Sequence, residues 1–381
     1  MRPAPARALL VAGEASGDLH AAGLVAALRR RLPQIAIHGI AGREARGAGM
    51  TTLVDIAEIA TLGLTEVAEK GPALWRSYRM LRREIVERPP DVLVLIDFPE
   101  FNLALGAVAK RRGVPVFYYV SPQVWAWRRS RVRKILRRVD RLAVLFPFEP
   151  AVYGNSDKVS FVGHPLLDRV HATRDREATL AAHGLEPAKR LVVLLPGSRR
   201  SEVERMLPEM VGAAERLATR HPLQFAVVLA PTLSRELVAP LLAGRSVVLP
   251  LIEHDPYNLI AAADLVLTAS GTATLEVALL ERPMIIMYRA SPLTYLAGRA
   301  LIRVPWIGMP NLIAGRAIVP ELIQTEASAS NIAREAEAIL SDPARQRAVR
   351  ADLAVVRQAL GAPGAADRAA ELVLALLKER A

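Results

Sequence analysis

One segment of the chain places small hydroxyl residues and a glycine directly after an apolar run, and this combination can bind phosphate. Residues 265–276 read LVLTASGTATLE. The apolar part predicts a buried strand, and Ser270, Gly271 and Thr272 fall where a helix should begin. There a glycine lets the backbone approach a ligand, and free N–H groups at the helix start attract an anion. The segment therefore predicts a cradle for nucleotide phosphates, bound between two domains.

A second junction of this kind lies at residues 195–203, LPGSRRSEV. Gly197 and Ser198 separate an apolar run from a predicted helix, and Arg199 could clamp a phosphate through paired hydrogen bonds. Further along the first segment, Glu276 could reach the hydroxyl pair of a ribose. Exposure on a helix face is the simpler alternative for Glu276.

Carboxylates follow another apolar run, at residues 92–102, VLVLIDFPEFN. Asp97 stands where the predicted strand ends, beside two phenylalanines that would partly desolvate it. Desolvation raises the pKa of a carboxyl group, which suits a general base that takes a proton from a hydroxyl. Alternatively, Asp97 or Glu100 only caps the next helix.

The first predicted strand ends in the glycine-bracketed loop GEASGD at residues 13–18. Its spacing differs from the dinucleotide fingerprint, and its carboxylates would repel a pyrophosphate, so NAD is not expected. Glu14 and Ser16 are candidates to contact a sugar or acceptor. A plain structural turn, with Asp18 capping the following helix, explains the loop equally well.

Residues 121–138, SPQVWAWRRSRVRKILRR, predict an aromatic residue pair followed by a basic amphipathic helix. Aromatic anchors beside basic residues suit an anionic membrane surface. A solvated basic face and a nucleic-acid contact are the alternatives. The candidate membrane residues are Trp125, Trp127, Arg128, Arg131, Arg133 and Lys134.

A metal centre is not expected from the sequence. The chain has no cysteine, its seven histidines are scattered, and no Asp-x-Asp triplet occurs. His164 is more simply a structural residue. Asn311 and Arg316, in the apolar segment 310–316, line a cleft or pack in the core. We expect neither metal nor cofactor.

The elements that must position these residues alternate between strands and helices. Two series are separated by a charged stretch at 166–190, and Ala- and Arg-rich helices follow residue 328. This alternation predicts an α/β protein with two Rossmann-like domains facing an interdomain cleft. We place the domains at 1–168 and 169–344, with the helices of about 345–381 packing back on the first. The strands are expected near 7–12, 35–40, 92–97, 115–120, 141–146, 191–195, 225–230, 246–250, 264–268 and 284–288, and the main helices near 18–32, 72–87, 101–112, 202–220, 256–262 and 272–281.

The composition indicates a folded protein that binds acidic partners. The chain has 381 residues, 52% of them hydrophobic, and a net charge of +12. Such a charge favours nucleic acid, anionic lipid or phosphorylated molecules, although a GC-rich genome also inflates arginine. No apolar run approaches the roughly 18 residues that span a bilayer, so a cytosolic protein is expected.

Taken together, these motifs resemble those of the lipid-A-disaccharide synthases, bacterial glycosyltransferases of outer-membrane lipid biosynthesis. The resemblance spans nearly the whole chain, in the family's order. One position departs from it, because the family's second carboxylate is usually Asp where this chain has Glu100. The matching segments are GEASGD, DFPEFN, SPQVWAW, GHP at 163–165, LPGSR, SGTATLE and PNLIAGR.

The resemblance implies a GT-B fold and an inverting transfer from UDP-2,3-diacylglucosamine to 2,3-diacylglucosamine 1-phosphate, giving a β-1,6-linked disaccharide and UDP. It also implies peripheral attachment to the inner face of the cytoplasmic membrane in a Gram-negative bacterium, and it allows a homodimer through the C-terminal helices. Asp97 or Glu100 is then the base. Diphosphate and ribose binding falls to Gly197, Ser198, Arg199, Ser270, Gly271, Thr272, Thr274 and Glu276, and acceptor or cleft contacts to Glu14, Ser16, Gln123, Asn311 and Arg316.

Two rival functions remain at the sequence level. Another UDP-sugar enzyme of the same fold, a non-hydrolysing UDP-N-acetylglucosamine 2-epimerase or a murein-type N-acetylglucosaminyltransferase, would also bind UDP. A basic nucleic-acid-binding protein would explain the charge but not the two phosphate-type junctions.

Overall fold

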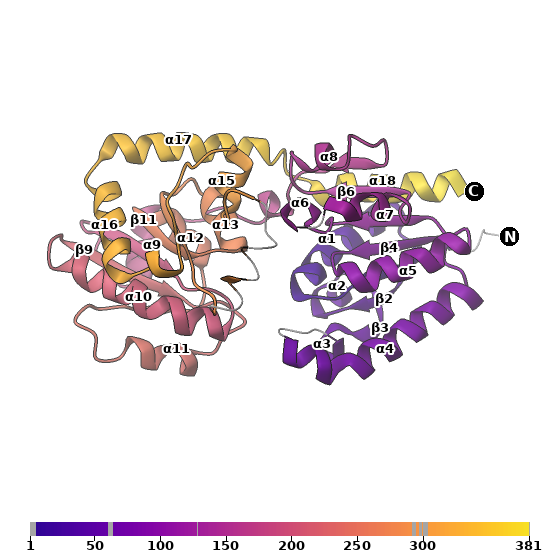
Figure 1. Ribbon diagram of the computed structural model, residues 1–381, viewed down its shortest axis with the longest axis horizontal. Helices are drawn as coiled ribbons and strands as arrows, with labels where there is room; N and C mark the ends of the chain where they lie inside the picture. Colours follow the sequence, from indigo (N-terminus) through magenta and orange to yellow (C-terminus); the bar gives the residue numbers. More distant parts are fainter. Residues whose placement is uncertain are drawn as a thin grey trace. The chain divides into compact units, whose positions relative to one another are not determined.

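The chain forms two compact units (Figure 1). The computed structural model describes residues 5–59, 64–127, 129–291, 295–296, 299 and 304–380. Unit 1 comprises Met1–Pro165 and Gly361–Ala381, and unit 2 comprises Leu166–Leu360. The division therefore falls a few residues before the boundary expected after 168. The chain returns to unit 1 at Gly361. Residues 345–360, which were expected to pack on the first domain, therefore belong to unit 2.

The described part of unit 1 contains a seven-stranded parallel sheet in the order β3-β2-β1-β4-β5-β6-β7. The order reverses between β1 and β4, whose last residues Ala12 and Ile96 are register partners. Central strands are covered on both faces, which explains their almost wholly apolar sequences. The strands are β1 (Arg7–Ala12), β2 (Ala36–Ala41), β3 (Thr51–Asp55), β4 (Val92–Ile96), β5 (Val116–Tyr119), β6 (Arg141–Val144) and β7 (Val159–Phe161).

Helices cover both faces of this sheet. One core cluster joins the sheet to α1 and α18, and the other joins it to α4, α5 and α7. Figure 1 shows α18, in yellow, lying among the indigo and magenta elements of unit 1. The helices are α1 (Ala15–Arg31), α2 (Arg43–Gly47), α3 (Ile56–Ile59), α4 (Leu64–Glu87), α5 (Pro99–Arg111), α6 (Val124–Trp127), α7 (Val132–Leu136), α8 (Glu149–Val152) and α18 (Ala365–Arg380), with 3-10 turns η1 (Arg129–Arg131) and η2 (Pro165–Asp168), the latter spanning the unit boundary.

Unit 2 repeats this architecture with a six-stranded parallel sheet in its described part, in the order β10-β9-β8-β11-β12-β13. Its order reverses between β8 and β11, where Leu195 pairs with Thr268. The strands are β8 (Arg190–Leu195), β9 (Leu223–Val228), β10 (Leu251–Ile252), β11 (Leu265–Ala269), β12 (Met284–Tyr288) and β13 (Glu321–Ile323).

Two core clusters again lie on opposite faces of the sheet. α10 and α16 contribute to one, and α12, α13 and α17 contribute to the other. The helices are α9 (Arg176–Ala182), α10 (Arg200–Ala218), α11 (Arg235–Leu242), α12 (Pro256–Ala262), α13 (Thr272–Leu279), α15 (Met309–Ala314), α16 (Ala329–Leu340) and α17 (Pro343–Ala359), with the 3-10 turn η3 (Gln324–Glu326).

The sequence-based strands match the central strands but fail at the sheet edges. β3, β7 and β13 were not expected, and each lies at an edge, where a strand has one neighbour and tolerates polar residues. The strand expected at 246–250 is wrong. Val248 is 86% exposed, and only Leu251 and Ile252 pair with β9.

Within the described ranges, no helix combines the length and apolarity needed to cross a bilayer.

Candidate active site at two strand-order reversals

The carboxylate candidate of unit 1 lies where the order of its sheet reverses. Gly13 and Glu14 follow β1, and Asp97 follows the adjacent β4. In open parallel sheets, ligands bind outside the carboxyl ends of the strands at such a reversal. The fold therefore brings together two candidates, Glu14 and Asp97, that are more than 80 positions apart in the sequence.

Asp97 sits in a strained turn that the surrounding structure holds in place. Asp97 and Phe98 both have positive φ, 47° and 48°, a conformation that side-chain-bearing residues rarely adopt. The carbonyl of Asp97 accepts hydrogen bonds from Asn102 Nδ2 at 2.8 Å and from Tyr118 Oη at 2.5 Å. Two buried side chains thus hold the backbone of Asp97 in this turn.

The environment of Asp97 favours its protonated form. Burial raises its pKa to about 6, the negative charge of Glu14 contributes in the same direction, and a hydrogen bond from the Phe98 N–H opposes both. A carboxylate with a pKa near 6 is ionised at neutral pH yet basic enough to accept a proton from a hydroxyl. Glu14 and Ser16 are exposed at the start of α1.

Glu100 has a different environment from Asp97. Its side chain is 66% exposed and forms an ion pair with Arg131. The two carboxylates therefore differ in exposure, because Asp97 is partly buried and Glu100 is exposed.

The loop at 13–18 contributes one contact that the sequence did not reveal. A Cβ atom on Gly13 would lie 2.3 to 2.8 Å from three atoms of the Phe98 ring, so only glycine fits there. The sequence suggested that Asp18 caps α1, but the structure shows that it does not. It lies inside α1 and accepts the N–H groups of Gly42, Glu44 and Ala45, and so caps α2 instead.

Trp125 is buried, contrary to its expected membrane contact. It is 7% exposed, and its ring meets the rings of Phe146 and Phe148 at 6.3 and 5.3 Å. Beneath this cluster, buried Glu149 accepts the N–H groups of Leu145 and Phe146, and burial raises its pKa to about 7. The tryptophan fixes the 121–127 loop, which leaves Gln123 exposed.

The basic stretch after Trp125 does not form the single helix that the sequence predicted. It consists of α6, the turn η1 and α7. Arg131 pairs with Glu100, while Arg133 and Lys134 are exposed. Arg128 lies outside the described residues, as does the side chain of Trp127.

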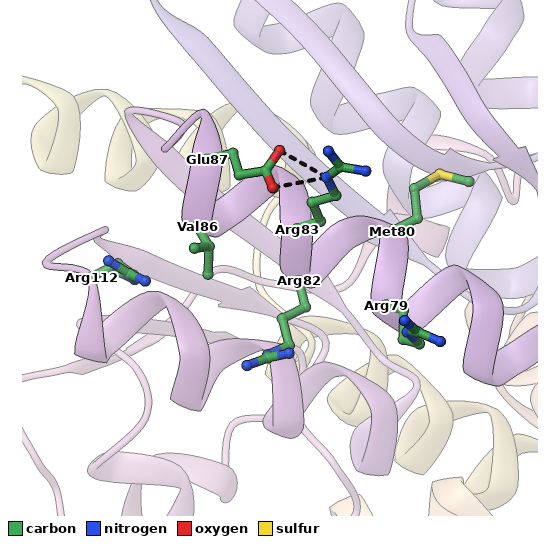
Figure 2. A pocket seen from close by; sticks show the side chains of 7 residues that line it. All are labelled: Arg79, Met80, Arg82, Arg83, Val86, Glu87 and Arg112. Carbon is green, nitrogen blue, oxygen red and sulfur yellow. Dashed lines mark hydrogen bonds and ion pairs between the residues drawn. The ribbon is translucent and has the colours of Figure 1, made fainter.

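A different basic surface lies on the C-terminal half of α4. Trp75 is 61% exposed and Met80 is 47% exposed, both unusual for large apolar side chains. Figure 2 shows the adjoining pocket, whose volume is about 530 Å³. Glu87 binds Arg83 within it, at 2.8 Å. Its lining residues are Arg79, Met80, Arg82, Arg83, Val86, Glu87 and Arg112.

In unit 2, both phosphate-type junctions follow the strands at which the sheet order reverses. Gly197 and Ser198 follow β8, and Ser270 and Gly271 follow the adjacent β11. The two loops therefore share one edge of the sheet, at the position where open parallel sheets bind ligands.

The junction after β8 is occupied by a carboxylate of the chain itself. Glu202 accepts the N–H groups of Ser198 and Arg199 at 3.0 and 3.3 Å, and its other oxygen binds Arg199 Nη1 at 3.2 Å. Arg199 remains 63% exposed, and such exposed ion pairs contribute little energy. The capping role of Glu202 was missed, although a carboxylate three residues after a helix-start residue is its usual signal.

The junction after β11 differs because, among the residues that the structure describes, no side chain caps the start of α13. Gly271 has a φ of 155° and no atom within 4 Å of an added Cβ. Ser270 Oγ donates to the carbonyl of Ile307, and buried Thr274 donates to the carbonyl of Gly271 at 2.8 Å. Thr274 therefore shapes the loop, while Gly271 and Thr272 are exposed.

Glu276 is partly buried on α13, near the same loop. Tyr257 Oη of α12 donates to its Oε1 at 3.1 Å. Burial raises the pKa of Glu276, whereas the Tyr257 hydrogen bond and the positive charge of Arg169 lower it. No local pattern in the sequence indicated Tyr257, because this contact joins two helices.

The remaining cleft candidates, Asn311 and Arg316, both have partners within unit 2. Asn311 is fully buried. Its amide nitrogen donates to Val319 and Glu321, and its oxygen accepts the N–H groups of Ile318 and Val319. Arg316 pairs with Asp352. The structure thus favours the packing alternative for Asn311.

Within the described residues, no group of three or more Asp, Glu or His side chains is arranged to hold a metal ion.

Comparison with known proteins identifies the family. Residues 8–375 match the family model described as lipid-A-disaccharide synthetase. The lipid-A-disaccharide synthase of Geobacter sulfurreducens is 48% identical over 373 residues, 97% of each chain. That of Myxococcus xanthus is 43% identical over 98% of each.

Solved structures show the fold that these sequences share. A UDP-GlcNAc 2-epimerase from Neisseria meningitidis, bound to UDP-GlcNAc, superimposes with a TM-score of 0.62 at 14% identity over 98% of this chain and 100% of its own. MurG of Acinetobacter baumannii gives 0.59 at 14% identity, with the same coverage. These likenesses establish the GT-B fold, and the much higher identity to the synthases decides between functions within it. The chain therefore belongs to the lipid-A-disaccharide synthase family of glycosyltransferases.

Proposed function

We propose that the enzyme transfers 2,3-diacylglucosamine from its UDP conjugate to 2,3-diacylglucosamine 1-phosphate, forming a β-1,6-linked disaccharide 1-phosphate and UDP. Identities of 43% to 48% to lipid-A-disaccharide synthases over nearly the whole chain support the reaction class. The observation that carries the mechanism is Asp97, a partly buried carboxylate with a pKa of about 6 at the strand-order reversal of unit 1.

In this mechanism, the 6-hydroxyl oxygen of the acceptor attacks the anomeric carbon of the donor. The new C–O bond forms as the bond to the diphosphate breaks on the opposite side, which inverts the anomeric configuration. Asp97 takes the hydroxyl proton, and UDP leaves with the bonding electron pair. Glu14, Ser16 and Gln123 are exposed and available to the acceptor sugar.

Unit 2 would supply the nucleotide site. The uncapped start of α13, at Gly271 and Thr272, offers backbone N–H groups to the departing diphosphate. Arg199, whose side chain is 63% exposed, can exchange its partner Glu202 for a phosphate. Glu276 would accept hydrogen bonds from the ribose hydroxyls.

An assay of two isosteric variants tests the base. We expect Asp97→Asn to lower kcat by about 10²- to 10⁴-fold, and Glu100→Gln to retain activity within a few-fold. Product would be followed by mass spectrometry with both lipid substrates in detergent. Calorimetric titration with UDP is the control for folding, because both variants should bind UDP like the wild type. An active Asp97→Asn beside an inactive Glu100→Gln would assign the base to Glu100.

We also propose that the enzyme docks peripherally on the anionic inner face of the cytoplasmic membrane, where its acylated substrates reside. The surface that best supports docking is the C-terminal half of α4, because exposed Met80 lines a pocket with four arginines and exposed Trp75 lies on the same helix. Aromatic and basic side chains together suit a lipid headgroup layer. Arg133 and Lys134 on α7 can add positive charge.

Flotation with vesicles of phosphatidylcholine, with or without phosphatidylglycerol, tests this docking. Reversal of Arg79 and Arg82 to Glu should weaken binding to the anionic vesicles. Reversal of Arg205 and Arg216, exposed on α10 of unit 2, changes the net charge equally and should bind like the wild type. Equal loss in both variants would show a net-charge effect, and loss only after reversal of Arg133 and Lys134 would assign docking to α7.

A further inference from the structure

Tyr257 of α12 contacts Glu276 of α13 in a way that the proposed reaction does not yet use. The phenol O–H donates to Glu276 Oε1 at 3.1 Å. No other described side chain forms a hydrogen bond to Glu276 in this structure. The contact joins two helices that flank the candidate nucleotide site, on the edge of unit 2 where the phosphate-type loops lie.

The backbone beside Tyr257 is held firmly. Asp255 adopts a left-handed conformation with a φ of 69° immediately before the helix begins at Pro256. Asn258, which is 5% exposed, accepts the N–H groups of Thr173 and Arg174 through Oδ1 and donates to Asp255 through Nδ2. These bonds hold Asp255 and Asn258, the residues on either side of Pro256 and Tyr257. The backbone that carries the Tyr257 phenol is therefore well anchored where the phenol contacts Glu276.

Tyr257 can act only as a donor towards Glu276. Burial and the nearby Glu276 charge raise the pKa of Tyr257 to about 12, so the phenol keeps its proton at neutral pH. An ionised carboxylate has about four acceptor sites on two oxygens. One bond from Tyr257 uses a single site and sets the rotation of the carboxylate, which leaves Oε2 free for ligand hydroxyls.

The same contact counteracts the effect of burial on Glu276. Burial raises the pKa of Glu276, and the Tyr257 hydrogen bond is the larger of the two influences that oppose it, ahead of the positive charge of Arg169. An ionised Glu276 accepts hydrogen bonds from two hydroxyls, whereas a protonated carboxyl would donate one bond and lose acceptor capacity.

We propose that Tyr257 is a positioning residue for the nucleotide, orienting Glu276 to accept the two hydroxyls of a ribose and so favouring ribonucleotides over 2′-deoxynucleotides. This inference rests on the proposed role of Glu276 in binding ribose. It adds a residue on a different helix whose effect should depend on the sugar of the nucleotide. A residue that only supported the fold would affect both kinds of nucleotide equally.

Calorimetric titration of the full-length enzyme with UDP and with 2′-deoxy-UDP tests the proposal. The loss of one orienting hydrogen bond in Tyr257→Phe should weaken UDP binding by about 3- to 10-fold and change 2′-deoxy-UDP binding less than about 2-fold. Tyr153→Phe is the matched control, because its hydroxyl pairs with Ser121 in unit 1. It should bind both nucleotides like the wild type.

The outcomes separate this inference from the proposed function. Equal loss of both nucleotides in Tyr257→Phe, or no loss of either, would overturn the role of Tyr257 while leaving that of Glu276 intact. Glu276→Gln provides the second reading, because it should abolish the preference for UDP. An unchanged preference in Glu276→Gln would refute the ribose contact itself and with it the role of Tyr257.

Discussion

At the scale of single residues, two carboxylates three positions apart have opposite environments. Asp97 lies in a strained turn and is partly desolvated, whereas Glu100 is exposed and forms an ion pair with Arg131. Sequence alone could not separate them, because both follow the same strand. The difference comes from what packs around each side chain, because burial and the charge of Glu14 act on Asp97.

Because its pKa is raised, ionised Asp97 should lower the free energy of unfolding at neutral pH. Its folded-state pKa of about 6 lies above the ordinary value of 3.8, so ionisation destabilises the fold as pH rises through this range. We expect Asp97→Asn to increase the free energy of unfolding by about 1–3 kcal/mol at pH 8. Below about pH 3 this carboxyl group is protonated in both the folded and the unfolded state, and the gain should vanish. Urea denaturation at both pH values measures it, and a gain that persists at low pH would contradict the assignment.

Gly13 should be essential to the geometry of Asp97. A Cβ atom there would displace the Phe98 ring and with it the strained turn that begins at Asp97. We expect Gly13→Ala to lower kcat by at least about 10-fold, in line with the effect of small misplacements of catalytic groups, while UDP affinity is retained. Gly47→Ala is the matched control, because nothing lies within 4 Å of its added Cβ. Full activity of Gly13→Ala would show that the turn is not needed for catalysis.

At the scale of elements, α18 is the part of unit 1 that the chain adds last. Its apolar face, with Ala369, Ala370, Val373 and Leu376, is buried in the same cluster as α1 and the sheet. Its surface arginine Arg380 also donates to the carbonyl of Pro90 at 2.7 Å. The helix therefore completes a core that residues 1–165 leave open.

Truncation of a buried residue on α18 should destabilise unit 1. We expect Leu376→Ala to lower the free energy of unfolding by about 2–4 kcal/mol, because it removes buried contacts and leaves a cavity. Lys378→Ala, on the last turn of the same helix, should stay within about 0.5 kcal/mol of the wild type. Denaturant titration followed by circular dichroism measures both. A small effect of Leu376→Ala would show that α18 docks only loosely.

At the scale of the whole molecule, the two units differ in how the chain builds them. Unit 2 is one continuous segment with two core clusters of its own, whereas unit 1 is assembled from both ends of the chain. Each unit places its candidate residues where its own sheet order reverses.

This difference predicts unequal behaviour of fragments. Residues 166–360 should fold alone and bind UDP, because their core requires no other part of the chain. Residues 1–165 should lack cooperative unfolding, because the face covered by α18 would be exposed to water. Adding residues 361–381 through a linker should restore the transition. Thermal unfolding followed by circular dichroism distinguishes these cases, and a cooperative 1–165 fragment would refute the prediction.

Local sequence patterns were enough to predict the family, the two series of strands and helices, and the loops after β1, β4, β8 and β11. These features are local. A central parallel strand is buried on both faces and so reads as a continuous apolar run, and a glycine junction marks its own turn. Asp97, Gly271 and Glu276 could be chosen for this reason.

Tertiary structure alone decided which of these residues have the environment that chemistry needs. Burial of Trp125, full bonding of Asn311, capping by Glu202 and the contact between Tyr257 and Glu276 all join residues that local patterns do not relate. The edge strands β3, β7 and β13 were not predicted for a similar reason. An edge strand pairs with only one other strand, so it can contain polar residues and lacks the continuous apolar run of a central strand. Burial and pairing depend on what packs against a residue from elsewhere in the chain, and only the folded molecule specifies that.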